Sequence, residues 1–130
     1  MNREVLCGRV EALSRTDIAE RYLTVAELAA EDDADAARNV AVGNAVLAGI
    51  AACDALCCLG LGRRSRGQDH RAAADLLRQV DTTLARDLEK LLQLKDTAHY
   101  GDRVVSSEKL TSAIRSARRL VEGAREATRD

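Results

Sequence analysis

The sequence predicts an all-α protein, and three features of its composition support this fold class. The 130 residues include no Pro, Phe or Trp, and aromatic residues make up only 2% of the chain. All-β domains need β-branched and aromatic residues with turns rich in Gly and Pro, so they are excluded. Ala, Leu and Arg are the most abundant residues, and all three are strong helix formers, as are Glu and Lys. A hydrophobic content of 46% at a formal net charge of −1 also excludes a disordered chain.

The length and the segment pattern predict one domain over residues 1–130, with its core over about 17–127. Four helical segments with short connections favour an antiparallel four-helix bundle, or five helices if a short one precedes the first. The first segment covers about residues 17–31, where apolar residues from Ile18 to Leu28 recur in steps of three and four. Ser14 or Thr16 is expected to cap it.

The second segment, about residues 34–62, is apolar nearly all round, as expected for the central helix of a bundle. Ala45, Gly49 and Cys53 recur every four residues along it. Small side chains at this spacing let another backbone come close, so we expect this face to form a subunit seam.

Two polar residues of this helix, Asn44 and Asp54, share another face. That face is either a solvent-facing stripe or a cleft or dimer seam, where buried polar groups would need partners. The apolar run 40–61 is long enough to span a membrane. An Asp near the centre of a span costs about 2.5–3.5 kcal/mol, so we expect a buried helix of a soluble protein and no membrane contact.

A glycine-rich turn follows at residues 60–67, and the third segment covers about 70–100, with Gln68 or Asp69 as its cap. Residues 81–83 (Asp-Thr-Thr) weaken this helix and could kink it, because these side chains compete for backbone hydrogen bonds. The last helix starts after Ser106 or Ser107 and runs to about residue 127.

The four cysteines are expected to be reduced thiols. No secretory signal is seen at the N-terminus, so we expect a cytoplasmic protein. Cys53 and Cys57 stand one helical turn apart and could chelate zinc as thiolates. Cysteine in a tight helix interface more often acts as a small hydrophobe, so we expect no metal and no cofactor.

One candidate catalytic site lies at the end of the third segment. Lys95 and His99 continue the apolar seam by steps of four, and Tyr100 follows. The ammonium would keep the imidazole neutral, so that His99 could accept a proton from a ribose hydroxyl while Lys95 stabilises a phosphorane. Alternatively, these side chains only satisfy the last carbonyls of a helix that ends at Gly101.

Three stretches stand in a recognisable order: GIAACDALCC at 49–58, DHRAAADLLRQV at 69–80 and LLQLKDTAHYG at 91–101. Over about residues 35–125 this layout resembles the HEPN family of small helical bundles. The resemblance implies four or five helices and a dimer, and in many members a metal-independent ribonuclease with an Arg, a following His and often a nearby Tyr. His99 and Tyr100 match the His and Tyr, but Lys95 replaces the Arg at a shorter spacing. HEPN members without the motif act as binding or scaffolding modules.

A basic cluster around the glycine turn is the candidate phosphate-binding surface. A second row of arginines lies on the last helix, from Arg115 to Arg129. The isoelectric point near 6.1 argues against strong duplex binding, and the lack of aromatic residues argues against base stacking. The cluster consists of Arg63, Arg64, Arg66, His70 and Arg71.

These observations predict a cytoplasmic, HEPN-like homodimer that binds RNA or a nucleotide, with weak or lost ribonuclease activity. The alternative is a non-enzymatic adaptor that binds a protein partner, for example in a toxin–antitoxin or defence system. A third interpretation is a small-ligand pocket lined by Asn44, Asp54 and His99.

Overall fold

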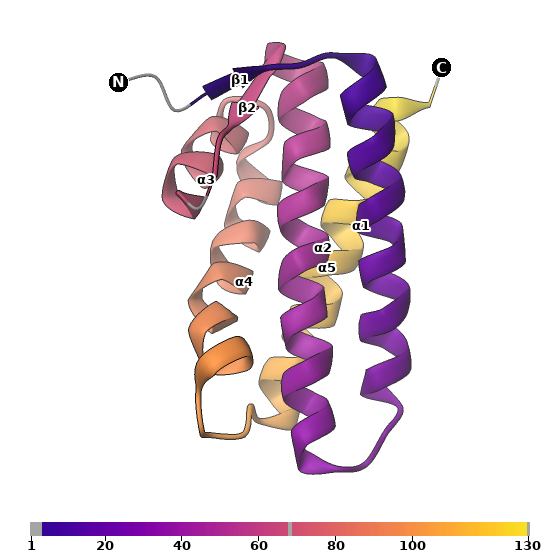
Figure 1. Ribbon diagram of the computed structural model, residues 1–130, viewed down its shortest axis with the longest axis vertical. Coiled ribbons are helices and arrows are strands. Elements are labelled where there is room, and N and C mark those ends of the chain that lie inside the picture. Colours follow the sequence, from indigo (N-terminus) through magenta and orange to yellow (C-terminus); the bar gives the residue numbers. More distant parts are fainter. Residues whose placement is uncertain (1–3, 68, 130) are drawn as a thin grey trace.

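The prediction of an all-α protein is confirmed by the computed structural model, which describes residues 4–67 and 69–129. Five helices account for most of the chain, and two short strands pair beside them (Figure 1). The elements in chain order are β1 (Glu4–Leu6), α1 (Arg9–Ala30), α2 (Asp35–Leu61), β2 (Arg63–Ser65), α3 (His70–Arg78), α4 (Thr82–Tyr100) and α5 (Ser107–Thr128).

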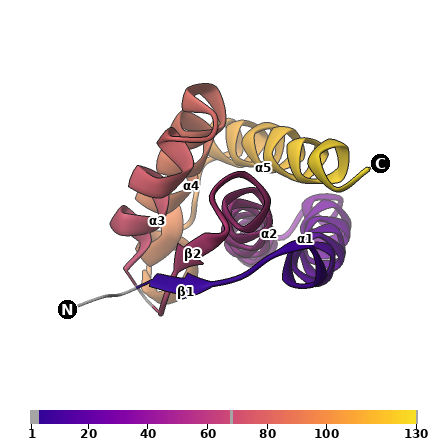
Figure 2. The same ribbon diagram turned by 90° about the horizontal axis from the view of Figure 1, so that it is seen from above.

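Helix α2 is the centre of the molecule, as its apolar sequence predicts. Seen from above, it lies between α1, α5 and the α3–α4 pair (Figure 2). Among the described residues, it is the one helix long and apolar enough to cross a membrane, and 78% of its most apolar stretch is buried inside the protein. A core helix shows this pattern because neighbouring helices cover its apolar surface on several sides.

The small-residue face of α2 is occupied within the chain itself, so the expected subunit seam at Ala45, Gly49 and Cys53 is wrong. All three residues are buried. A Cβ on Gly49 would lie only 2.5 Å from Cδ1 of Leu91 and 3.2 Å from Cδ1 of Leu120. The small side chains therefore let α4 and α5 approach α2, and no surface is left there for a second subunit.

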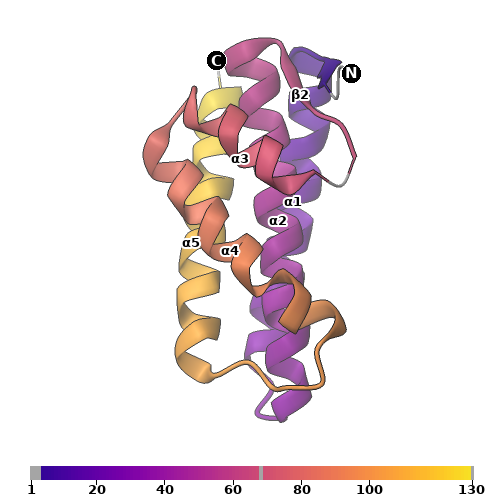
Figure 3. The ribbon, with the colours of Figure 1, turned by 90° about the vertical axis from the view of Figure 1, so that its left-hand side faces the viewer.

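The predicted single helix over residues 70–100 is wrong, because the chain breaks it into α3 and α4. The break lies next to the stretch expected to weaken the helix. Asp69 caps α3 by accepting from the N–H of Ala72 at 3.0 Å, and Asp81 caps α4 by accepting from Leu84 at 2.9 Å. Figure 3 shows α3 crossing the upper part of the molecule while α4 descends beside α5. The fifth helix thus arises here and not before the first helix.

Helix α1 starts earlier than predicted, at Arg9. Its N-terminus is closed by Glu11, whose side chain accepts from the N–H of Gly8 at 2.7 Å. Ser14 and Thr16 lie inside the helix, where the Thr16 hydroxyl donates to the Ala12 carbonyl at 2.8 Å. They are not caps, because the helix already begins at Arg9, before both of them.

A disulfide links Cys7 to Cys58, so the expectation of four reduced thiols is wrong. Strand β1 pairs antiparallel with β2, and the N–H of Cys7 donates to the Gly62 carbonyl at 3.0 Å. Gly62 ends α2 in the left-handed region, at φ 72°. This turn brings Cys7 over the last turn of α2, with the two cysteine Cα atoms 5.1 Å apart. Cys53 and Cys57 are free and buried.

Candidate phosphate-binding site

His99 is fixed against the central helix. It lies in the last turn of α4, and its Nε2 is 3.1 Å from the carbonyl oxygen of Gly43. The ring fits because residue 43 has no side chain: a Cβ there would lie 2.7 Å from Cδ2 of His99. One ring nitrogen of the candidate catalytic His is therefore engaged by the backbone of α2.

The other two candidate catalytic residues have different surroundings. Tyr100 is 80% exposed and meets the edge of the His99 ring, with ring centroids 6.0 Å apart. The charge of Lys95 acts on His70 of α3, where it contributes to a lowered pKa. The structure thus brings Lys95 to α3 and His99 to α2, and the catalytic role of the three residues stays a prediction.

Asn44 and Asp54 lie at separate places on α2. Asn44 shares a hollow of about 380 Å³ with His99, and its amide donates to the Val40 carbonyl of its own helix at 2.9 Å. Asp54 does not line this hollow. It is 8% exposed and meets Arg15 at 3.0 Å and Arg64 at 4.0 Å. Burial raises the pKa of Asp54, although both arginines act to lower it.

The basic cluster divides into two parts. Arg63 pairs with Glu4 at 2.8 Å, and Arg64 lies between Asp54 and the Ser65 carbonyl. Arg63 therefore ties β2 to β1, and Arg64 ties β2 to α2. Arg66 and Arg71 are exposed and form no ion pair within the part of the chain that the structure describes.

A hollow of about 460 Å³ lies between α3 and α4, on the side shown in Figure 3. Burial lowers the pKa of its wall residue His70, and the Lys95 ammonium lowers it further, while Asp69 raises it. The hollow is lined by His70, Arg71, Ala74, Asp75, Arg78, Glu89, Leu92 and Gln93.

The charges of this hollow differ at its two ends. At one end Arg78 binds Asp75 at 2.7 Å and Glu89 at 2.9 Å, so its charge is compensated. At the other end Arg71 forms no ion pair among the described residues; it follows His70 in the sequence, and the charge of Lys95 acts on His70. Sequence reasoning found these three residues but assigned them to two sites. It missed Asp75, Arg78 and Glu89, because their meeting depends on the break before α4.

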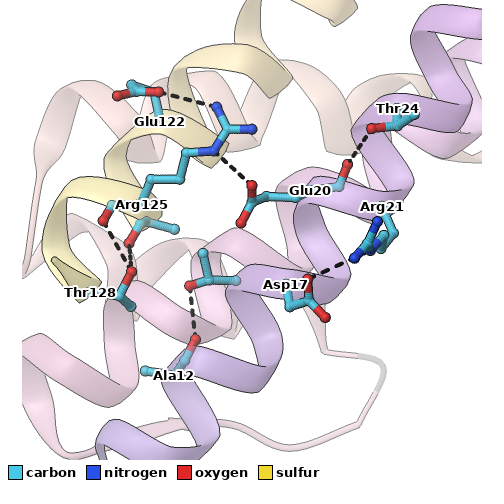
Figure 4. A network of polar contacts seen from close by, with 10 residues as sticks. Ala12, Asp17, Glu20, Arg21, Thr24, Glu122, Arg125 and Thr128 are labelled. Atoms are coloured by element: carbon cyan, nitrogen blue, oxygen red, sulfur yellow. Dashed lines mark hydrogen bonds and ion pairs between the residues drawn. The ribbon is translucent and has the colours of Figure 1, made fainter.

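Two arginines of the second row, which lies on α5, are engaged with another helix. Arg118 pairs with Glu27 at 2.7 Å. Arg125 pairs with Glu20 (Figure 4), at a distance of 3.0 Å. These pairs tie α5 to α1, which makes this row a poor phosphate-binding surface.

Within residues 4–67 and 69–129, no group of three or more His, Cys, Asp or Glu side chains is placed to hold a metal ion. In comparisons with known proteins, no family model matches the chain and no curated relative matches it. The hollow between α3 and α4, with its cationic end, is the best-formed candidate site.

Proposed function

We propose that the protein binds the phosphate of a nucleotide or of RNA in the hollow between α3 and α4, without efficient cleavage. One observation carries this proposal: the hollow is walled by His70 and by Arg71, which forms no ion pair within residues 4–67 and 69–129, and the charge of Lys95 acts on His70. The acid that acts on His70, Asp69, does so less strongly than Lys95, and a bound phosphate would supply further negative charge there. Ala74 and Leu92 offer an apolar wall for the body of the ligand, and the volume lies in the usual range for small-molecule sites.

Two observations support weak or lost ribonuclease chemistry. His99 directs Nε2 to the Gly43 carbonyl, so Nδ1 is the ring nitrogen left to accept a proton as a general base. The charge of Lys95, the other candidate catalytic residue, acts on His70 of α3. We further propose that the helices form an antiparallel, HEPN-like bundle, a cytoplasmic homodimer like the family it resembles. Light scattering that finds a monomer at micromolar concentration would contradict the proposed dimer.

The binding proposal is tested by titrating the full chain with AMP, with inorganic phosphate and with a short single-stranded RNA, followed by NMR. Lys95→Gln should weaken binding about tenfold, which corresponds to about 1.4 kcal/mol. Lys90→Gln is the matched control, because Lys90 is exposed on the same helix but lines a different hollow. Equal affinities for the two variants would contradict the site, and binding should raise the pKa of His70 in the natural chain.

Cleavage is tested separately by incubating the protein with RNA and EDTA. We expect little or no cleavage by the natural chain. Efficient cleavage that is abolished in His99→Ala would overturn the non-catalytic proposal and establish His99 as the catalytic residue.

A second candidate function is a protein-interaction module, favoured by apolar side chains exposed around the start of α1. Leu6 and Val10 are 86% and 76% exposed, and Leu13 lies one turn further on. A stable protein partner recovered with the natural chain, and lost with Leu6→Ser and Val10→Ser together, would support this function.

A further inference from the structure

We propose that the Cys7–Cys58 disulfide is a redox-sensitive strap, whose reduction releases residues 4–7 from β2 while the helices stay folded. The bond joins the segment before α1 to the last turn of α2, 51 positions apart in sequence. This inference does not depend on phosphate binding.

Among the described residues, the contacts of β1 other than the disulfide are few. Three residue pairs join it to β2, one further hydrogen bond links Cys7 to Gly62, and a partly exposed ion pair links Glu4 to Arg63. Leu6, the largest apolar side chain of the strand, points into solvent and adds nothing to the core. A two-stranded ribbon of this size is marginally stable at best, so the covalent bond is what keeps β1 in place.

The helices, in contrast, do not need β1. Helix α1 has its own N-terminal closure at Gly8 and Glu11, and α2 has its own C-terminal closure at Gly62. The buried core consists of side chains from the five helices and of Val105 in the loop before α5, with none from β1 or β2. Release of residues 4–7 is therefore expected to stop at Gly8 and to leave α1 folded.

The accessibility of the two sulfur atoms defines the chemistry. Cys7 is partly buried, whereas Cys58 is 2% exposed. The thiolate of a dithiol reductant attacks Sγ of Cys7, forms a mixed disulfide and expels the Cys58 thiolate, which takes up a proton. The second thiol of the reductant then closes its own disulfide and frees the Cys7 thiol. The protein bond gains two electrons and two protons, and the dithiol loses them.

The two remaining cysteines do not compete in this exchange. Cys53 and Cys57 are both buried in α2. A hydrogen bond with Cys57, together with burial, raises the pKa of Cys53 well above its usual value, so Cys53 stays a thiol. The reaction is therefore confined to Cys7 and Cys58.

Reduction of the disulfide should also affect the turn that leads into α3. Strand β2 ends at Ser65, whose hydroxyl donates to the carbonyl of Asp69, the cap of α3, at 3.3 Å. Once β1 has left, β2 loses its partner strand, and residues 63–67 gain freedom. The position of the basic turn thus depends on the state of the disulfide.

The experiment compares the oxidised and reduced full chain by NMR and circular dichroism, with millimolar dithiothreitol and no denaturant or ligand. A Cys53→Ala, Cys57→Ala chain, in which only the strap can react, is treated in parallel with the natural chain. We expect the {¹H}–¹⁵N NOE of residues 4–7 to collapse on reduction, while that of residues 42–56 and the helical signal are retained. Cys7→Ser should show the open state without reductant.

Three results would overturn the proposal. The first is a strap that resists dithiothreitol in the folded protein. The second is a reduced chain in which residues 4–7 stay as ordered as before. The third is loss of helical signal together with the strap, in both the natural chain and the double-alanine chain, because the disulfide would then hold the whole fold.

Discussion

A buried carboxylate between α4 and α5 makes a sharp test of how the helices are held together. Asp87 is 3% exposed and accepts hydrogen bonds from the Ser116 hydroxyl at 3.1 Å and from Arg119 at 2.9 Å and 2.6 Å. Asp87→Ala removes all of these bonds. The buried Ser116 hydroxyl is then left without a partner, which costs about 1–3 kcal/mol. The Arg119 pair adds about 0.5–1 kcal/mol, because that side chain is 43% exposed and screened by water.

We therefore expect Asp87→Ala to lower the free energy of unfolding by about 2–4 kcal/mol, measured by urea unfolding followed by circular dichroism. Ser116→Ala added to this variant removes the orphaned hydroxyl, so the double variant should cost less than the sum of the two single changes. Asp96→Ala is the control and should stay within about 0.5 kcal/mol, because Asp96 is exposed on α4 and forms no ion pair in the part of the chain that the structure describes. An Asp87→Ala chain as stable as the control would refute this account of the α4–α5 contact.

Three further predictions follow from other contacts. Gly43→Ala should displace His99, because the new Cβ would lie 2.7 Å from its ring; the His99 ring signals should move in NMR spectra, and unchanged signals would contradict the contact. Because the pKa of His70 is lowered from 6.5, stability should fall as the pH drops below 6.5, and urea unfolding should show a smaller fall in His70→Gln. The Cys7→Ser, Cys58→Ser chain should lose about 4 kcal/mol in urea unfolding, as expected for a loop closed over 51 positions. A loss large enough to unfold the chain at 25 °C would argue against a separable strap.

The helices could be predicted from the sequence because helix formers, caps and apolar periodicity all act locally. The α2 boundaries come within one residue of the prediction, since Gly62 ends the helix in a conformation that favours glycine. The break before α4 could only be foreseen as a weak point, because Asp81 can continue a helix or cap one. Which of these it does depends on whether α3 can pack against the rest of the protein, and local sequence does not determine that packing.

The site was harder to predict than the helices because it depends on that same break. In one continuous helix, His70 and Lys95 would lie seven turns apart and could not act on each other. Folding α3 back beside α4 brings them together and also joins Arg78 to Glu89. Residue types therefore gave only a list of cations as candidate phosphate-binding residues. Which of these cations lie close together depends on how the chain folds, and the sequence pattern did not show that.

The disulfide bears on the proposed cytoplasmic location. Spacing alone gave no reason to pair Cys7 with Cys58, because the pairing depends on β1 folding back over the end of α2. Protein disulfides are rare in the reducing cytosol, and those that occur there are usually transient and serve catalysis or redox sensing. A cytoplasmic location of a chain with this bond therefore fits best with a strap that opens and closes. A strap that resists dithiothreitol in the folded protein would argue against both proposals at once, since a permanent bond belongs to an oxidising compartment.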